Sequence, residues 1–188
     1  MKIVTLGLTA ALTLTSGLCA EEIAKMEQLA QPALTLSEMY AKAEAKAKAW
    51  KPDVVPVRLG NTSMGPLDAQ GRSTAWNLTF YSPSAKANVA VNLFRGMVTY
   101  WASPGDAGRI PDLKPGFLRD SAKLYAIAKQ HGADLIAKGY AVSIQTAAAP
   151  SDRHATWYLT FATSDGTTAD LTVIVDANTG AVEKVLRD

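Results

Sequence analysis

The chain has 188 residues, and its 19 lysines and arginines against 17 acidic residues give a formal net charge of +2. Its single cysteine, Cys19, excludes internal disulfide bonds and cysteine-rich zinc sites, because both need at least two cysteines. No basic stripe with interleaved aromatic residues is present, so we expect no nucleic acid among the partners.

The first 20 residues have the layout of a secretory signal peptide. Lys2 supplies a positive charge, a nearly unbroken apolar run extends from Ile3 to Leu14, and small residues precede Glu21. This run is shorter than the roughly 20 residues that a transmembrane helix needs. We therefore predict cleavage after Ala20, a periplasmic or secreted location, and no membrane span in the mature chain.

Cys19 leaves one alternative open. Lipoprotein processing would make this cysteine the lipid-bearing first residue, although Leu18 is larger than the residue that usually precedes such a cysteine. Cleavage after Ala20 would instead leave a mature chain without cysteine, which suits a bacterial periplasm better than a small disulfide-stapled secreted domain.

Two segments near the start of the mature chain have helical spacing. Residues 21–30 carry four apolar side chains in such a pattern and predict a short, loosely attached helix. Thr35 and Glu38 then form a capping-box pattern, and apolar residues recur on one helical face as far as Trp50. Pro52 disfavours helix at the residue before it, so we expect this second helix to end there.

An internal similarity is the most informative feature of the sequence. The pattern Trp-x-Leu-Thr-Phe occurs at residues 76–80 and again at residues 157–161, each time followed by a polar turn, an alternating run, a tight turn and a final run. A helical stretch and an extended segment precede each occurrence, and Gly132 is expected to interrupt the second helix. The pattern predicts a duplicated unit of one helix and about four strands.

We therefore predict an α+β fold of two repeats, in which each helix is followed by a three- to four-stranded antiparallel meander sheet. Strands joined by such short turns pair antiparallel, because a parallel return needs a long crossover. Whether the repeats share one sheet or pack as separate layers stays open. The predicted divisions are a signal peptide over residues 1–20, a first repeat over 21–102, a Pro/Gly linker over 103–116, and a second repeat over 117–188.

The run Asp-Ala-Asn-Thr-Gly at residues 176–180 begins like a calcium-binding loop. An EF-hand, however, needs glycine at its sixth position and glutamate at its twelfth, where this chain has Ala181 and Arg187. Asp and Asn side chains bond their own backbone in turns, and glycine accepts a positive φ. The sequence therefore predicts a hairpin corner.

A helix followed by strands that end in "VIVDANTGAVEKV" resembles a PepSY-type domain, whose last hairpin often carries an Asp-x-x-Thr-Gly-x-Val turn. The resemblance is good over residues 120–188. It is weaker over residues 35–101, where Phe94-Arg95-Gly96 replaces the acidic turn, so the first repeat would be a degenerate copy. The resemblance implies a small extracytoplasmic domain without catalysis, often linked to binding or restraining peptidases and other envelope proteins.

Residues with catalytic or metal-binding potential form no recognisable pattern in the sequence. His131 and His154 lie in different predicted elements and have no partner at ligand spacing, and Ser63 lacks the flanking glycines of a nucleophile elbow. We therefore expect a protein that is not an enzyme, with no metal site and no cofactor.

Strand alternation directs Trp76 and Trp157 into the core and leaves other large side chains on the opposite face. These side chains either pack between the two repeats or form an exposed surface for a protein or peptide, with Trp101 as its anchor. The leading hypothesis is an exported binding module that acts as an inhibitor or accessory factor of a cell-envelope protein. The alternative is a periplasmic carrier that holds a small molecule between sheet and helix. The predicted partner-binding residues are Tyr81, Phe94, Trp101, Tyr158 and Ile174.

Overall fold

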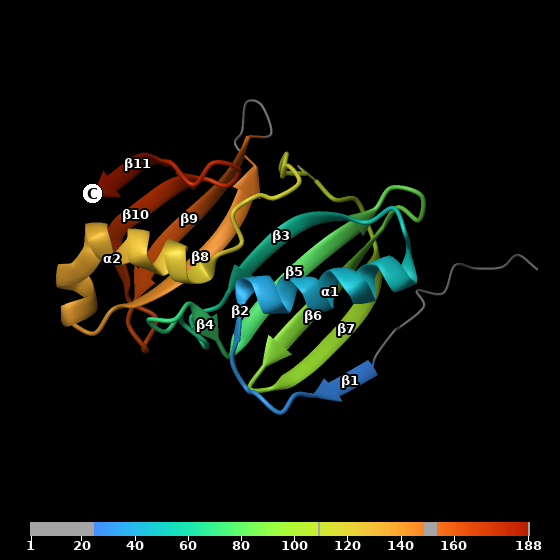
Figure 1. Ribbon diagram of the computed structural model, residues 1–188, viewed down its shortest axis with the longest axis horizontal. Helices are drawn as coiled ribbons and strands as arrows, with labels where there is room; N and C mark the ends of the chain where they lie inside the picture. The colour runs from blue at the N-terminus through green and yellow to red at the C-terminus, as the bar shows by residue number, and fades with distance from the viewer. Residues whose placement is uncertain (1–24, 109, 149–153, 188) are drawn as a thin grey trace, which may run out of the picture.

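The computed structural model describes residues 25–108, 110–148 and 154–187 (Figure 1). The predicted signal peptide and Cys19 lie outside these residues. Within the described ranges, no helix combines the length and the apolar character that crossing a membrane requires.

Nine antiparallel strands form one continuous sheet, and two helices lie on one of its faces (Figure 1). The strand order is β1-β7-β6-β5-β3-β8-β9-β10-β11, so β1 and β11 are the two edge strands. We call the face without helices the open face. The sheet consists of β1 (Lys25–Gln28), β3 (Val55–Asn61), β5 (Ala75–Ser82), β6 (Ala87–Phe94), β7 (Met97–Pro104), β8 (Ala141–Ala148), β9 (Ala155–Ala162), β10 (Thr168–Asp176) and β11 (Val182–Arg187).

The helices are α1 (Leu36–Trp50), which packs on β5 and β6, and α2 (Ser121–Ala137), which packs on β8, β9 and β10. A separate two-stranded sheet pairs β2 (Leu34–Thr35) with β4 (Arg72–Ser73). Strand β2 directly precedes α1 and β4 lies in the connection between β3 and β5, so this pairing ties the start of α1 to that connection.

The predicted fold class of two helix-plus-meander repeats is wrong. The described chain is mostly sheet, with one nine-stranded sheet, one two-stranded sheet and two helices. Separate meanders would leave β3 and β8 as edge strands, each unpaired on one side, whereas these two strands pair with each other in the observed sheet. Residues 25–28, predicted to be helical, form strand β1 and pair with β7. The predicted domain boundaries stay a prediction.

The local signals for the helices are confirmed. Thr35 caps α1, with its hydroxyl accepting the Glu38 N–H at 3.3 Å while the Glu38 carboxylate accepts the Thr35 N–H at 2.8 Å. Hydrogen bonds from the backbone and hydroxyl of Thr35 lower the pKa of Glu38. Gly132 interrupts the helical backbone of α2, and a Cβ there would lie 2.5 Å from the ring of Phe161. Glycine at this position therefore lets α2 approach the sheet closely.

The two predicted core tryptophans are confirmed as core residues. Trp76 is 1% exposed and Trp157 is 0% exposed, and both belong to one apolar cluster that extends beneath both helices. Their indole N–H groups donate to the backbone carbonyls of Leu34 at 2.8 Å and Leu118 at 3.0 Å. Each buried indole donor is thus satisfied by backbone close to the start of a helix.

Strand pairing is sparsest where β3 meets β8, because Gly60 and Gln145 form the single residue pair between these two strands. Side chains complete the junction: the Leu59 N–H donates to Thr146 Oγ1 at 2.9 Å, and the Ile144 N–H donates to Asn61 Oδ1 at 2.7 Å. A Cβ at Gly60 would lie 2.6 Å from the carbonyl oxygen of Ile144. A glycine and two hydrogen-bonding side chains thus join the two halves of the sheet, together with a backbone hydrogen bond from the Leu67 N–H to the Val142 carbonyl at 2.9 Å.

We predict that Thr146→Val lowers the free energy of unfolding by about 1–3 kcal/mol, because it leaves the buried Leu59 N–H without its acceptor. Urea denaturation measures this change. Thr160→Val is the matched control: it makes the same substitution at an exposed strand position and should stay within about 0.5 kcal/mol of wild type. Equal effects of the two substitutions would contradict the role of the junction.

Candidate protein-binding face

Strand register places one residue from each of the nine strands in a single row across the open face. The middle of this row is polar, with the side-chain amides of Asn92, Asn77 and Gln145, whereas apolar residues occur toward both ends. The open face is therefore polar at its centre and more apolar toward its two ends. From β1 to β11, the row contains Met26, Thr99, Asn92, Asn77, Gly60, Gln145, Tyr158, Ile174 and Lys184.

All five predicted partner-binding residues lie on the open face, but in two separate groups. Tyr158 and Ile174 are direct cross-strand neighbours on β9 and β10, and both are half-buried. Tyr81, Phe94 and Trp101 belong to β5, β6 and β7, on the other side of the β3–β8 junction. Phe94 is 42% exposed and Trp101 is 44% exposed. Because one sheet contains them all, the two groups do not face each other across an interface.

Phe94 and Trp101 belong to a larger apolar group around Thr99. Met26 pairs with Thr99, Met97 and Trp101 lie two residues to either side of Thr99 on the same face, and Phe94 pairs with Met97. Met26 is the most exposed large apolar residue here, at 74%. Sequence reasoning missed Met26 because residues 21–30 have helical spacing. We call Met26, Phe94, Met97 and Trp101 the apolar patch.

A positive charge lies on the same face as the apolar patch, three strands away from Trp101. The register aligns Trp101, Ala90, Thr79 and Arg58 across β7, β6, β5 and β3. Among the described residues, no carboxylate forms an ion pair with Arg58. Its surroundings are neutral, because Arg58 lines a surface hollow together with Val57, Thr79, Asn88, Ala90, Ser103 and Ala107.

The turn between β6 and β7 presents Phe94 at one end of the open face. Arg95 and Gly96 have φ values of 49° and 86°, as a tight two-residue hairpin turn requires. The guanidinium of Arg95 lies over the Phe94 ring, 5.2 Å from its centroid. The exposed ring is thereby positioned by its neighbour, and a second cation adjoins the apolar patch.

The acidic turn forms the corner between β10 and β11, as the sequence predicts. Asp176 Oδ1 accepts the backbone N–H groups of Asn178 at 2.8 Å and Thr179 at 2.6 Å, and Gly180 has a φ of 77°. Burial alone would raise the pKa of Asp176, but the hydrogen bonds from Thr179 and Asn178 and the adjacent His154 together lower it.

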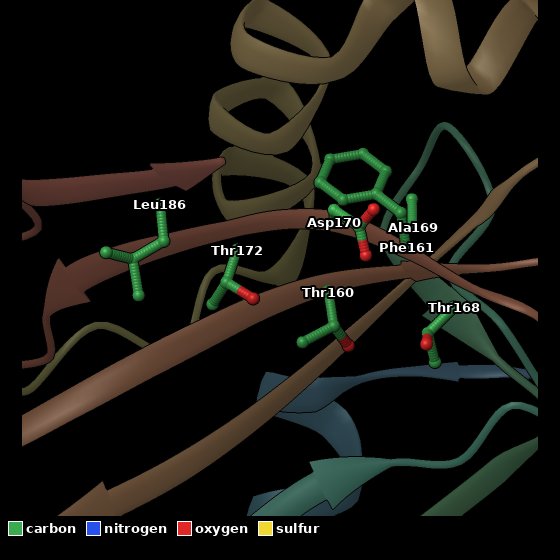
Figure 2. Close-up of a pocket in the computed structure, with 7 residues that line it drawn as sticks. All are labelled: Thr160, Phe161, Thr168, Ala169, Asp170, Thr172 and Leu186. Carbon is green, nitrogen blue, oxygen red and sulfur yellow. The ribbon is translucent and has the colours of Figure 1, made fainter. Parts of the chain in front are cut away.

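A hollow also opens among β9, β10 and β11 (Figure 2). These strands are at the other end of the strand order from the apolar patch. The β9–β10 ladder is irregular between Thr168 and Thr172, and this irregularity loosens the sheet at that point. Three threonines and a carboxylate make the hollow more polar than the apolar patch. Its lining residues are Thr160, Phe161, Thr168, Ala169, Asp170, Thr172 and Leu186.

The alternative function, a small-molecule carrier, requires a ligand groove between helix and sheet. Buried side chains fill this space, among them Met39 and Ala43 from α1 and Trp76 and Phe80 from β5. This packing does not support a ligand groove between helix and sheet. The carrier function stays a prediction.

No protein-family model, curated protein or solved structure matches this chain. The resemblance to PepSY-type domains therefore stays a prediction that rests on the sequence motifs. The geometry of the open face is the remaining basis for a functional conclusion.

We predict that Trp101→Ala changes the free energy of unfolding by less than about 1 kcal/mol, because the side chain is 44% exposed. Trp157→Ala removes a fully buried side chain and should cost about 3–5 kcal/mol. Urea denaturation of both variants tests this contrast. A large loss of stability in Trp101→Ala would mean that Trp101 serves the fold and is not available to a partner.

Proposed function

We propose that the protein is an exported, non-enzymatic binding protein whose open face holds another protein of the cell envelope, acting as its inhibitor or accessory factor. The apolar patch is the observation that carries this proposal. Three of its four side chains are among the large apolar residues that remain exposed in the described structure. Contiguous exposed apolar surface of this kind marks interaction sites in many proteins.

The character of the face favours a protein partner over a small ligand. Small-molecule sites are usually concave and enclose most of their ligand. Here the apolar patch lies on the surface of a broad sheet, and polar strand positions such as Thr99, Asn92 and Asn77 lie within and beside it. Aromatic and methionine anchors with polar surroundings are typical of protein interfaces.

The charges near the apolar patch indicate the chemistry of the partner. Arg58 and Arg95 both lie at this part of the open face, and Arg58 has no ion pair within the described residues. A carboxylate on the partner would pair with Arg58 while an apolar side chain covers Trp101. The proposed partner surface is therefore apolar with an acidic residue at its border.

Site-specific photo-crosslinking tests the proposal. A photoreactive amino acid replaces Ala90, beside Trp101 on the open face, in the full chain expressed in its own host. The same replacement at Lys129, exposed on α2, is the control for random collisions. We expect a discrete crosslinked protein from position 90 and none from position 129. The same products from both positions, or none from position 90, would refute binding at this face.

The crosslinked protein, once identified and purified, permits an affinity measurement. We predict that Trp101→Ala weakens its binding by about 30-fold or more, because a central buried aromatic anchor contributes about 2 kcal/mol or more. Calorimetry gives the dissociation constants. Met64→Ala removes another highly exposed methionine, in the loop after β3, and should bind like wild type. Unchanged affinity in Trp101→Ala would contradict the assigned anchor.

Charge reversal at Arg58 should reduce the association rate, because the partner's acidic residue would then meet a like charge. We predict a larger effect of Arg58→Glu at low salt than at high salt, since salt screens exposed charges. Stopped-flow or surface plasmon resonance measurements provide the rates. Lys129→Glu makes the same charge change on the helix-bearing side and should alter the rates much less. An equal reduction of the association rate in both variants would indicate long-range steering by the net charge alone. It would contradict a specific pairing between Arg58 and a carboxylate of the partner.

A further inference from the structure

Three potential metal ligands come together on the open face at the end opposite the apolar patch. His154 directly precedes β9, Asp176 ends β10, and Glu183 belongs to β11. Asp176 follows His154 by 22 residues, and Glu183 follows Asp176 by 7 residues. This spacing matches no familiar metal-ligand motif. Strand pairing brings them together, because β9, β10 and β11 are neighbours in the sheet.

The donor atoms already lie close to the spacing of a metal site. His154 Nε2 is 2.6 Å from Glu183 Oε1 and 3.2 Å from Asp176 Oδ2, and one ligand atom from each residue lies within 4.8 Å of the others. Donors that share an ion at about 2.0–2.2 Å are themselves about 3–3.5 Å apart. A small outward movement of the Glu183 carboxylate would admit an ion among the three atoms.

The fold positions each carboxylate separately. Asp176 uses Oδ1 for the backbone N–H groups of the hairpin corner, which leaves Oδ2 directed at His154. The β10–β11 register shifts so that Lys184 pairs with Ile174 and Val182 pairs with Val175. Glu183 is the residue skipped by this bulge. A bulge can re-aim a side chain, and here it brings Glu183 to the same imidazole as Asp176.

The charge balance of the group favours a cation. Among the described residues, Asp176 and Glu183 form ion pairs only with His154. Two carboxylates against one imidazole leave a net negative charge even when the imidazole is protonated. A divalent cation would offset that charge.

From this geometry we propose that His154, Asp176 and Glu183 form a binding site for a divalent transition-metal ion, with Zn²⁺ the best-fitting common ion. One imidazole nitrogen with two carboxylate oxygens suits Zn²⁺, Mn²⁺, Fe²⁺ or Co²⁺, whereas Mg²⁺ and Ca²⁺ prefer oxygen donors alone. Three protein ligands leave at least one coordination position open to water or to a donor from another molecule. The bound ion would fasten the start of β9 to the β10–β11 hairpin.

This site is independent of the proposed protein-binding function, because the apolar patch lies at the other end of the strand order. It also departs from the expectation that the chain has no metal site. Strand pairing, not spacing along the sequence, brings Asp176 and Glu183 to His154.

Zinc titration of the full chain, purified and freed of metal by dialysis against a chelator, tests the proposal. Calorimetry should show saturable binding of one Zn²⁺ per chain, and Zn²⁺ should raise the melting temperature. Co²⁺ should bind at the same site and give visible ligand-field bands that Zn²⁺ abolishes. Absence of saturable Zn²⁺ binding to the wild-type chain overturns the site.

The variants His154→Ala and Glu183→Gln should each weaken Zn²⁺ binding at least about tenfold and remove the thermal stabilisation. Glu183 lies on an exposed edge strand, so its conservative replacement should leave the circular dichroism spectrum unchanged. His131→Ala removes the other histidine, and Asp170→Asn removes another exposed carboxylate on β10, so both should bind like wild type. Wild-type affinity in His154→Ala and Glu183→Gln, or an equal loss in His131→Ala, would assign the zinc to another place.

Discussion

The continuity of the sheet across β3 and β8 is the constraint on which the open face depends. Backbone pairing there is reduced to Gly60 and Gln145, and the side chains of Asn61 and Thr146 accept the N–H groups that a regular ladder would satisfy. A buried N–H without an acceptor is costly, so these two side chains are structural members of the sheet. Position 60 is likewise restricted to glycine, because a Cβ atom there would clash with the carbonyl oxygen of Ile144.

The open face is backed by a well-packed core on the helix-bearing side of the sheet. Both helices pack on the same side, and one apolar cluster lies beneath them, with Trp76 and Trp157 as its largest members. Their indole N–H groups reach backbone just before each helix and so connect helix position to strand position. A surface backed by such packing can present exposed residues in fixed relative positions, which lowers the ordering cost of binding.

Local features of this fold were predictable from the sequence, and long-range features were not. The capping box at Thr35, the break at Gly132, the buried tryptophans and the hairpin corner at Asp176 all depend on neighbours within a few residues. The single sheet could not be foreseen, because its junction depends on contacts between residues about 85 positions apart. Alternation within a strand shows which side chains share a face, but it does not identify the adjacent strand.

The same distinction applies to the candidate sites. Alternation correctly placed Tyr81, Phe94, Trp101, Tyr158 and Ile174 on the strand face opposite the core. It could not separate them into two groups, because the strand order decides which of them are neighbours. Met26 was missed because its segment has helical spacing, whereas in the structure it pairs with Thr99 on a strand far along the chain. The cluster around His154 was missed because it depends on the bulge at Glu183, which strand alternation does not reveal.

The last strand also has a consequence for the behaviour of the protein in concentrated surroundings. Strand β11 ends the sheet and leaves one side of its backbone available to other chains, a common route to aggregation. Glu183, Lys184 and Arg187 supply three charges in its six residues. Because an incoming strand would have to desolvate these charges, they disfavour edge-to-edge pairing of β11 with another chain.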